Sequence, residues 1–300
     1  MKYGLSISQR GDDGAPRAVA DIAGLAEEHG FDFVSYGDAP ALLREVYSTL
    51  GLVAGRTDRI SIGPLVTNPV TRHPVVTGSA ICTLDELTGG RAFLGIASGD
   101  SGVLSLGEHP ASLDAVETAI RHVQALSRGE TADLPDAPAG DSRVEIDWVD
   151  TENIDGVPVW LAAEGPKTQA LAGRVADGVI LGGGLTPDLL ERQVDNVRRG
   201  ARAADRDLSE IDVWITARAN VAEDSDRAVE DLKPGLASMA NHSMRFTFED
   251  KGVPEGYHDR LRELQETYRP HEDPDSGDAA ILDRLGLTEF LASRYAIVGE

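Results

Sequence analysis

The chain has 300 residues, a formal net charge of −23 and 41% hydrophobic residues. This hydrophobic content suffices for the core of one α/β barrel, whereas no apolar run of about 18 residues is present that would cross a membrane. Acidic residues are spread along the whole chain and would repel nucleic acid and anionic membranes, so the sequence excludes both as expected partners.

The cysteine and lysine content predicts the environment of the protein. Cys82 is the only cysteine, so no internal disulfide can form and a reducing, cytoplasmic location is expected. It falls in a predicted helix, where a buried thiol is expected. Lysine occurs only at positions 2, 167, 233 and 251, and an acidic, arginine-favouring surface is typical of halophilic proteins. Met1 and Lys2 run directly into a strand-like segment, which predicts no signal peptide.

Strand-like and helix-like segments alternate from the first residues, which predicts a parallel sheet. The expected strands in the first part of the chain are residues 2–8, 31–36, 60–70 and 92–97, and the expected helices are 17–29, 42–54, 75–87 and 113–126. Gly30 and the Gly89-Gly90 pair supply helix stops. A polar segment, residues 131–155, is expected to be an excursion loop with an exposed hairpin around residues 144–149.

The alternation resumes after this loop. Strands are expected at 159–163, 178–181 and 211–217, with helices at 167–175, 187–204 and 226–239. Residues 241–290 contain two or three helix-like pieces and an acidic turn at 271–278, which predicts a helical insertion. A last β-like run covers residues 293–300. Seven strands precede it, so we expect a single TIM (β/α)8 barrel domain over residues 1–300 whose last strand–helix unit is truncated.

Small and polar residues follow most of these strands. The first strand provides Ser6 and Ser8, the second Asp38, the third Thr67 and Asn68, and the fourth Ser98, Gly99 and Asp100. The fifth and sixth strands end in Glu164-Gly165-Pro166 and Gly182-Gly183-Gly184. Because the carboxyl ends of barrel strands meet at one face, these residues are expected to surround one ligand site.

Glycines after the fifth and sixth strands indicate an anion site. Gly165, Gly182 and Gly183 permit close approach of the backbone to a ligand, and Pro166 begins a helix whose first N–H groups attract negative charge. Lys167 lies in the first helical turn, where a positive charge opposes the helix dipole. We therefore expect a phosphate clamp here, with a solvated lysine as the alternative.

Asp38 and Asp100 are the candidate acid–base residues, although either could instead cap the following helix. The seven histidines lack metal-ligand spacing, and His73, before Pro74, is expected to be a turn or cap residue. Nucleophile-elbow, phosphate-loop and dinucleotide-binding motifs are also missing, so hydrolase, nucleotide-kinase and Rossmann functions are not supported.

Four ordered motifs resemble the bacterial-luciferase-like superfamily: GPLVTNPVTRHP, TLDELTGGRAFLGIASGD, AAEGPKT and ADGVILGG. The branch that they resemble is the coenzyme F420-dependent one that includes methylenetetrahydromethanopterin reductase. The likeness covers residues 1 to about 222 and returns at 295–300.

The resemblance implies a homodimeric barrel with a non-proline cis peptide bond in the third strand, which by alignment is Leu65–Val66. It also implies that Leu65 and Val66 press against the deazaflavin ring, with Thr67 and Asn68 beside it. Asp38 and Ser98–Asp100 would lie near the ring. Gly165–Lys167 with Gly182 and Gly183 would hold the cofactor's phosphate and polar tail.

Two positions depart from the family pattern. Ala39 stands where many relatives have histidine, and Ser6 or Ser8 stands where the methanopterin reductases carry glutamate. Both changes remove proton-handling groups, which leaves Asp100 as the expected proton donor or orienting residue.

We predict an F420-dependent oxidoreductase that transfers a hydride to or from a small organic substrate. Its helical insertion is expected to cover the substrate with Phe246, Phe248, Tyr257 and Tyr268. The alternatives are an FMN-dependent monooxygenase and a non-catalytic flavin-binding relative.

Overall fold

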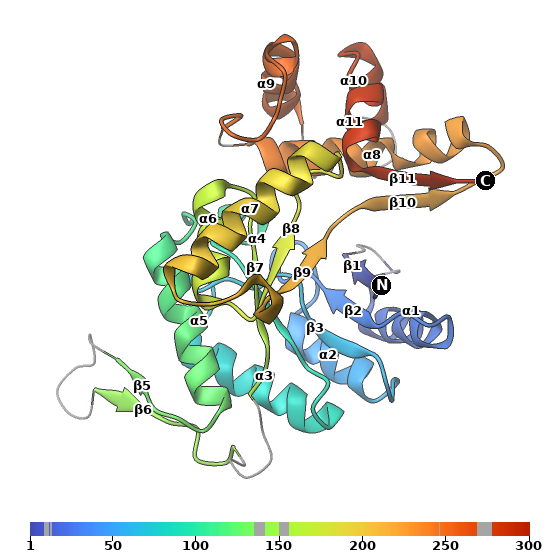
Figure 1. Ribbon diagram of the computed structural model, residues 1–300. Helices are drawn as coiled ribbons and strands as arrows, with labels where there is room; N and C mark the ends of the chain where they lie inside the picture. The colour runs from blue at the N-terminus through green and yellow to red at the C-terminus, as the bar shows by residue number, and fades with distance from the viewer. Residues whose placement is uncertain (9–11, 13, 135–141, 150–155, 246, 269–277) are drawn as a thin grey trace. The chain divides into compact units, whose positions relative to one another are not determined.

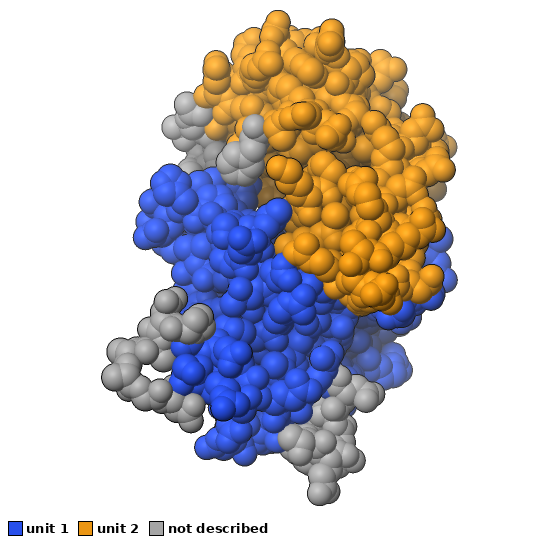
Figure 2. All heavy atoms as spheres, turned by 60° about the vertical axis from the view of Figure 1, so that its left-hand side comes forward, with its two compact units in different colours: residues 1–162, 175–178, 209–212 blue, residues 163–174, 179–208, 213–300 orange. Residues whose placement is uncertain are grey.

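The computed structural model describes residues 1–8, 12, 14–134, 142–149, 156–245, 247–268 and 278–300. Strands and helices alternate along most of the chain, as the sequence predicts (Figure 1). The chain divides into two compact units, which are coloured separately in Figure 2. Residues 1–162, 175–178 and 209–212 form the first unit, and residues 163–174, 179–208 and 213–300 form the second.

Parallel strands form the centre of the first unit. Strands β1 (Gly4–Ile7), β2 (Phe33–Tyr36) and β3 (Ser61–Pro64) pair in parallel in that order. Two bridges, Ile62 to Ala92 and Thr67 to Ile96, connect the β3 segment to β4 (Leu94–Ile96). Strand β4 pairs in parallel with β7 (Val159–Ala162). The third strand is shorter than the expected 60–70, because the pairing ends at Pro64.

Capping residues determine where the helices of the first unit begin and end. Helix α1 (Pro16–Glu28) begins at a proline, α3 (Pro74–Thr88) is capped by the His73 ring, and α5 (Leu113–Ser127) is capped by Ser112. Gly89 ends α3 in the left-handed conformation, with φ of 66°. The cap role predicted for His73 is confirmed, since its Nδ1 accepts a hydrogen bond from the Val75 N–H.

Two helices of this unit differ from the sequence expectation. Helix α2 (Val46–Ala54) begins at Val46 rather than at residue 42, because Glu45 is its cap and the Leu42 and Leu43 N–H groups donate to the Ala39 carbonyl in a separate turn. The short helix α4 (Ser101–Leu104) was not predicted. Cys82 on α3 is 6% exposed, as expected, and burial raises the pKa of its thiol to about 12.

Strands β8 (Gly178–Leu181) and β9 (Asp212–Ile215) begin in the first unit and continue in the second. The strand order is β4-β7-β8-β9. In the second unit β9 is followed by β10 (Arg218–Val221), a strand missed by the sequence analysis, which pairs in parallel with β11 (Ala296–Gly299). The last β-like run therefore contains a strand, but residues before Ala296 belong to helix α11 (Thr288–Tyr295).

Glycines allow α6 (Pro166–Val175) and α7 (Pro187–Ala203) to pack closely in the second unit. A Cβ atom on Gly200 would lie 1.9 Å from the Ala170 carbonyl oxygen. A Cβ atom on Gly173 would lie 2.0 Å from the Val197 carbonyl oxygen. Backbone therefore meets backbone where the two helices cross, and no larger residue fits at either position.

The predicted excursion loop contains a short antiparallel pair, β5 (Ala132–Asp133) with β6 (Arg143–Val144). The hairpin expected around residues 144–149 therefore lies earlier in the chain, because residues 132–133 pair with residues 143–144. Residues 135–141 and 150–155 of the loop lie outside the described part of the chain.

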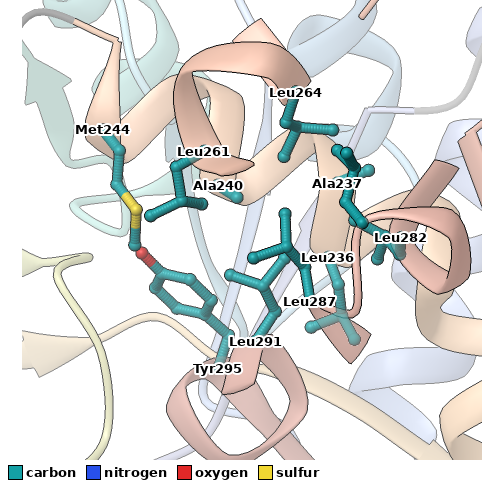
Figure 3. Packing of buried hydrophobic residues seen from close by; sticks show 11 residues of the cluster. Leu236, Ala237, Ala240, Met244, Leu261, Leu264, Leu282, Leu287, Leu291 and Tyr295 are labelled. Atoms are coloured by element: carbon teal, nitrogen blue, oxygen red, sulfur yellow. The ribbon is translucent and has the colours of Figure 1, made fainter. Parts of the chain in front are cut away.

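A separate hydrophobic cluster joins α8 (Ser225–Met244), α9 (His258–Thr267), α10 (Asp278–Arg284) and α11. Figure 3 shows their side chains directed toward one another, among them Leu236, Leu264, Leu282, Leu291 and Tyr295. The helical content expected for this region is confirmed in the described residues.

Four aromatic residues of this region, named in the sequence analysis, are expected to line a substrate pocket. Phe248, Tyr257 and Tyr268 pack against the hydrophobic cluster of the second unit. Tyr257 stacks on Phe290 with ring centroids 4.1 Å apart. These three side chains are partly buried against the cluster, and their role in lining a substrate pocket stays a prediction. Phe246 lies outside the described residues.

Glu27 stabilises the chain just before β3. Its Oε2 accepts hydrogen bonds from the backbone N–H groups of Asp58, Arg59 and Ile60 at 3.1, 2.6 and 2.8 Å. Partial burial alone would raise the pKa of Glu27, but these three donors and Arg59 lower it below its ordinary value of 4.5.

We expect Glu27→Gln to lower the free energy of unfolding by about 1 kcal/mol at neutral pH, because a charge-assisted bond to the backbone is lost. The folded-state pKa is the lower one, so this stabilisation is present above pH 4.5 and disappears as the pH falls through the folded-state value. Urea unfolding at pH 7 and pH 3 measures both effects, with Glu28→Gln as the control. An equal difference from wild type at both pH values would contradict the assignment.

No helix among the described residues is long and apolar enough to cross a membrane. The same residues contain no cluster of three or more His, Cys, Asp or Glu side chains arranged to hold a metal ion.

Candidate functional site

A bulge follows β3, and the peptide bond between Leu65 and Val66 is cis, as the family resemblance implied. The Leu65 N–H donates to the Tyr36 carbonyl and the Thr67 N–H donates to the Gly95 carbonyl, both at 2.9 Å. The bulge therefore remains hydrogen-bonded to the strands on either side. Leu65 and Val66 are half-buried and lie at the carboxyl end of the sheet.

Gly95 on β4 makes room for this bulge. A Cβ atom on Gly95 would lie 2.5 Å from the Pro64 carbonyl oxygen and 3.2 Å from Val66 Cγ1. Contacts this short to backbone cannot be relieved by turning a side chain. Only glycine therefore lets β4 pass beside the bulge in its present position.

Asp38 forms a buried charge network at the end of β2. Its Oδ2 accepts hydrogen bonds from Thr67 Oγ1 and from the Arg72 guanidinium, each at 2.7 Å. The Asp38 side chain is 3% exposed and that of Arg72 is 19% exposed. One carboxylate oxygen thus ties the end of β2 to the residue after the cis bond, and Arg72 compensates its charge.

Arg72, which the sequence analysis did not select, also binds a second carboxylate. Its other terminal nitrogen donates to Glu45 Oε1 at 2.9 Å, and its guanidinium lies 5.0 Å from the Tyr47 ring centroid. Burial alone would lower the pKa of Arg72, but Asp38, Tyr47 and Glu45 raise it. Burial raises the pKa of the Tyr47 phenol. The signal that could have identified Arg72 is its position in the TRHP motif, four residues after Asn68.

Asn68 has a local structural role in addition to its place near the bulge. Its Oδ1 accepts hydrogen bonds from the Val70 and Thr71 N–H groups at 3.0 and 2.9 Å. Asn68 is 3% exposed and Thr67 is fully buried. The side chains of both residues are thus engaged with the protein, whereas the neighbouring Leu65 and Val66 retain exposed surface.

The end of β4 lies against the same residues. A Cβ atom on Gly99 would lie 3.4 Å from Asn68 Cβ, and one on Gly102 would lie 2.7 Å from the Asp38 carbonyl oxygen. Ser98, Gly99 and Asp100 are half-buried. The structure therefore brings together Asp38, the segment 65–68 and Ser98–Asp100 within the first unit, as expected.

Asp100 stands before α4, but its side chain makes no capping hydrogen bond to that helix. Its backbone carbonyl accepts the Val103 and Leu104 N–H groups at 2.9 and 2.8 Å. The cap alternative for its carboxylate is thus not supported. Ser6 and Ser8 on the β1 segment are exposed, and Ser8 Cβ would lie 3.9 Å from a Cβ atom on Gly37.

The predicted anion site lies in the second unit. Pro166 begins α6, Lys167 is exposed in its first turn, and a Cβ atom on Gly165 would meet no atom of the described residues within 4 Å. The glycines after β8 are more crowded. A Cβ atom on Gly182 would lie 2.3 Å from Glu164 Oε1, and one on Gly183 would lie 2.7 Å from Gln193 Oε1. Both oxygens stand at the ends of flexible side chains that can shift, so packing disfavours a larger residue at Gly182 and Gly183 without forbidding it, whereas Gly165 is open among the described residues.

Polar residues surround a small cavity beside Gly183. Gln169, Gln193, Lys251 and Arg294 are buried and Glu164 is half-buried, and all five belong to the second unit. Arg294 donates to the carbonyls of Lys251 and Gly252 at 2.6 and 3.2 Å. Burial and the neighbouring Arg294 lower the pKa of Lys251, against the attraction of Glu164.

The fold is that of a parallel α/β barrel, and the first unit carries a hydrogen-bonded cis bulge at the end of its third strand. The model of the luciferase-like monooxygenase family matches residues 1–291, so the chain belongs to this family.

Among curated proteins, a 5,10-methylenetetrahydromethanopterin reductase from Methanolobus tindarius is 33% identical over 241 residues, covering 78% of this chain and 71% of the relative. An F420-dependent glucose-6-phosphate dehydrogenase from Nakamurella multipartita is 31% identical over 249 residues, covering 77% and 70%.

The solved structure of the coenzyme F420-dependent tetrahydromethanopterin reductase from Methanopyrus kandleri superposes with a TM-score of 0.78 and 25% identity. The match covers 99% of this chain and 86% of that one. The predicted barrel fold and family are confirmed, and the chain is an enzyme of the luciferase-like family.

Proposed function

We propose that the protein is a coenzyme F420-dependent oxidoreductase that exchanges a hydride with a small organic substrate. The observation that carries the proposal is the similarity, at 31–33% identity, to relatives that are named for tetrahydromethanopterin and for F420 chemistry. The two relatives act on unlike substrates, a pterin and a sugar phosphate. The cofactor, which we take to be common to both relatives, is therefore a better guide to the function of this chain than either substrate.

The residues present fit a flat cofactor with an anionic tail. Leu65, Val66, Ser98 and Gly99 are half-buried and follow the third and fourth strands, and the cis bulge is held by backbone hydrogen bonds to both neighbouring strands. We propose that these residues contact the deazaflavin ring. When bound, F420 supplies hydride transfer at its C5 position.

We propose that the second group of residues, Gly165–Lys167 with Gly182 and Gly183, holds the phosphate and the polar tail. The free N–H groups at the start of α6, the open space at Gly165 and the exposed Lys167 support this role. Gly182 and Gly183 would contribute backbone groups, since both are already packed against Glu164 and Gln193.

The two aspartates receive different roles in this proposal. Asp38 accepts two hydrogen bonds on one oxygen and is almost fully buried, so we propose that it orients Thr67 and the bulge. Asp100 is half-buried and its carboxylate does not cap α4. It is the better candidate to hold or move a proton beside the substrate.

The substrate is proposed only as a small organic molecule. Ser6 or Ser8 stands where the methanopterin reductases carry glutamate, and Ala39 stands where many relatives have histidine, which argues against a methylenetetrahydropterin. A homodimer in a high-salt cytoplasm is part of the same proposal, supported by the family resemblance, the single cysteine and the net charge of −23.

Titration of the purified protein with F420 and, separately, with FMN tests the function. Quenching of cofactor fluorescence should give tight binding of F420 and none of FMN at equal concentrations. Binding of FMN alone would overturn the proposal in favour of a flavin-dependent monooxygenase. Binding of F420 without oxidation of F420H2 by any of a panel of carbonyl, quinone and enone acceptors would favour the non-catalytic relative.

Gly165→Ala is expected to weaken cofactor binding without changing the stability of the fold. The added methyl meets no described atom within 4 Å, so the melting temperature should stay within about 1 °C of wild type. A ligand phosphate lying against this backbone would be displaced, and we expect the F420 dissociation constant to rise about 10-fold. Gly256→Ala, at a position with equally open surroundings, is the matched control. Unchanged F420 affinity in Gly165→Ala would remove Gly165 from the site.

A further inference from the structure

Residues 38–45, in the connection between β2 and α2, form a loop that one arginine holds at both ends. Arg72 Nη1 donates to Asp38 Oδ2 at 2.7 Å, and Nη2 donates to Glu45 Oε1 at 2.9 Å. Asp38 is the second residue after β2, and Glu45 is the residue immediately before α2. A planar guanidinium can bind two carboxylates at a fixed separation, whereas a lysine ammonium has no such fixed pair of donors.

The turn inside the loop is built from short-range contacts. The Leu42 and Leu43 N–H groups both donate to the Ala39 carbonyl at 2.8 Å, and a Cβ atom on Gly37 would lie 2.7 Å from Leu43 Cδ1. Pro40 and Ala41, at its tip, are exposed. These hydrogen bonds lie within the loop, whereas α4 packs against its first residues: a Cβ atom on Gly102 would lie 2.7 Å from the Asp38 carbonyl oxygen and 3.2 Å from Ala39 Cα. The ion pairs of Arg72 act on the two ends of the loop in addition to this packing.

The two carboxylates that Arg72 binds also form hydrogen bonds to the bulge and to α2. Asp38 Oδ2, which Arg72 binds, accepts the Thr67 hydroxyl, and Glu45 accepts the Ser48 N–H at 2.7 Å as the cap of α2. Burial alone would raise the pKa of Glu45, but the Ser48 and Tyr47 donors and Arg72 lower it. Arg72 therefore joins three segments at the carboxyl end of the strands.

We propose that Arg72 is a positioning residue that fixes the loop 38–45 as a wall of the substrate site and thereby determines substrate affinity. Arg72 acts through Asp38 and Glu45 and does not touch the reacting atoms. The proposal rests on the oxidoreductase function proposed above, because it assigns a role in substrate binding to a loop beside the predicted ring site.

Arg72→Lys is the main test variant, since it keeps the charge and removes the paired donors. Hydrogen–deuterium exchange should be about 10-fold faster at the amides of Leu42 and Leu43, with exchange in α5 unchanged. Arg121→Lys, which alters an exposed i,i+4 ion pair with Glu117 on α5, is the matched control and should leave the loop unchanged.

Kinetics separate positioning from a general structural effect. With F420H2 as hydride donor and menadione as the acceptor actually used, the KM for menadione should rise about 10-fold in Arg72→Lys while kcat changes less than about 3-fold. The hydride and one proton pass to the quinone, which becomes the quinol, and F420H2 becomes F420. Glu45→Gln removes the charge at one end of the loop, and since its amide oxygen can still accept the Ser48 N–H as the cap of α2, it should give a smaller change in the same direction.

Two results would overturn the assignment: wild-type exchange at Leu42 and Leu43 in Arg72→Lys, or a fall in kcat with KM unchanged. If Arg72→Lys does not fold, the exchange and KM values of Glu45→Gln decide. Failure of the wild-type protein to bind F420 would count against the proposed function, whereas the exchange experiment would still decide whether Arg72 holds the loop.

Discussion

Gly95→Ala is expected to abolish cofactor binding and to destabilise the protein by about 3 kcal/mol. The new Cβ atom would lie 2.5 Å from the Pro64 carbonyl oxygen and 3.5 Å from Leu65 Cα, so the chain before the cis bond has to move away from β4. This movement also strains the hydrogen bond from the Thr67 N–H to the Gly95 carbonyl. The proposed ring-contacting surface is then lost with the local fold.

Urea unfolding and fluorescence titration with F420 measure the two effects separately. Gly256→Ala adds the same methyl group where no described atom lies within 4 Å, and it should resemble wild type in both measurements. Wild-type stability together with wild-type F420 affinity in Gly95→Ala would contradict this expectation. The bulge would then tolerate displacement, and cofactor binding would not depend on the close approach of β4.

Gly200→Ala is expected to cost about 3 kcal/mol of stability by separating α6 from α7. Its Cβ atom would lie 1.9 Å from the Ala170 carbonyl oxygen and 2.7 Å from Ala170 Cα, both in the backbone of the other helix. Since α6 also carries the proposed phosphate-binding N-terminus, we expect the F420 affinity to fall as well.

Gly51→Ala is the matched control for Gly200→Ala. It makes the same change inside a helix, α2, where the new methyl meets no described atom within 4 Å. Alanine favours the helix over glycine by up to about 1 kcal/mol, so this variant should be slightly more stable than wild type. Thermal unfolding of the two variants should therefore give shifts of opposite sign. Shifts of the same sign would contradict the packing argument.

Local sequence signals predicted most of the secondary structure correctly. His73-Pro74 before an apolar-periodic segment and Gly89-Gly90 after it mark both ends of α3, because capping and left-handed glycine are local properties. The cis bond at Leu65–Val66 was reached only through the family resemblance, since no local pattern distinguishes such a bond.

Features that depend on distant partners were missed. Arg72 becomes important only when β2 and the TRHP motif are adjacent, which brings it to Asp38 across 34 positions of sequence. The packing of Phe248, Tyr257 and Tyr268 against the hydrophobic cluster of the second unit was also not predicted, because it depends on helices that are distant in the sequence. The crowding at Gly182 by Glu164 is likewise visible only in three dimensions.

The burial of Cys82 has a practical consequence for spectroscopy. Its thiol is 6% exposed and its pKa is raised to about 12, so it should react slowly with maleimide and iodoacetamide reagents at neutral pH. A cysteine introduced at exposed Ala41 would then carry a dye or spin label alone, without prior removal of the native residue. Distance measurements from such a label could follow the turn between β2 and α2 during catalysis.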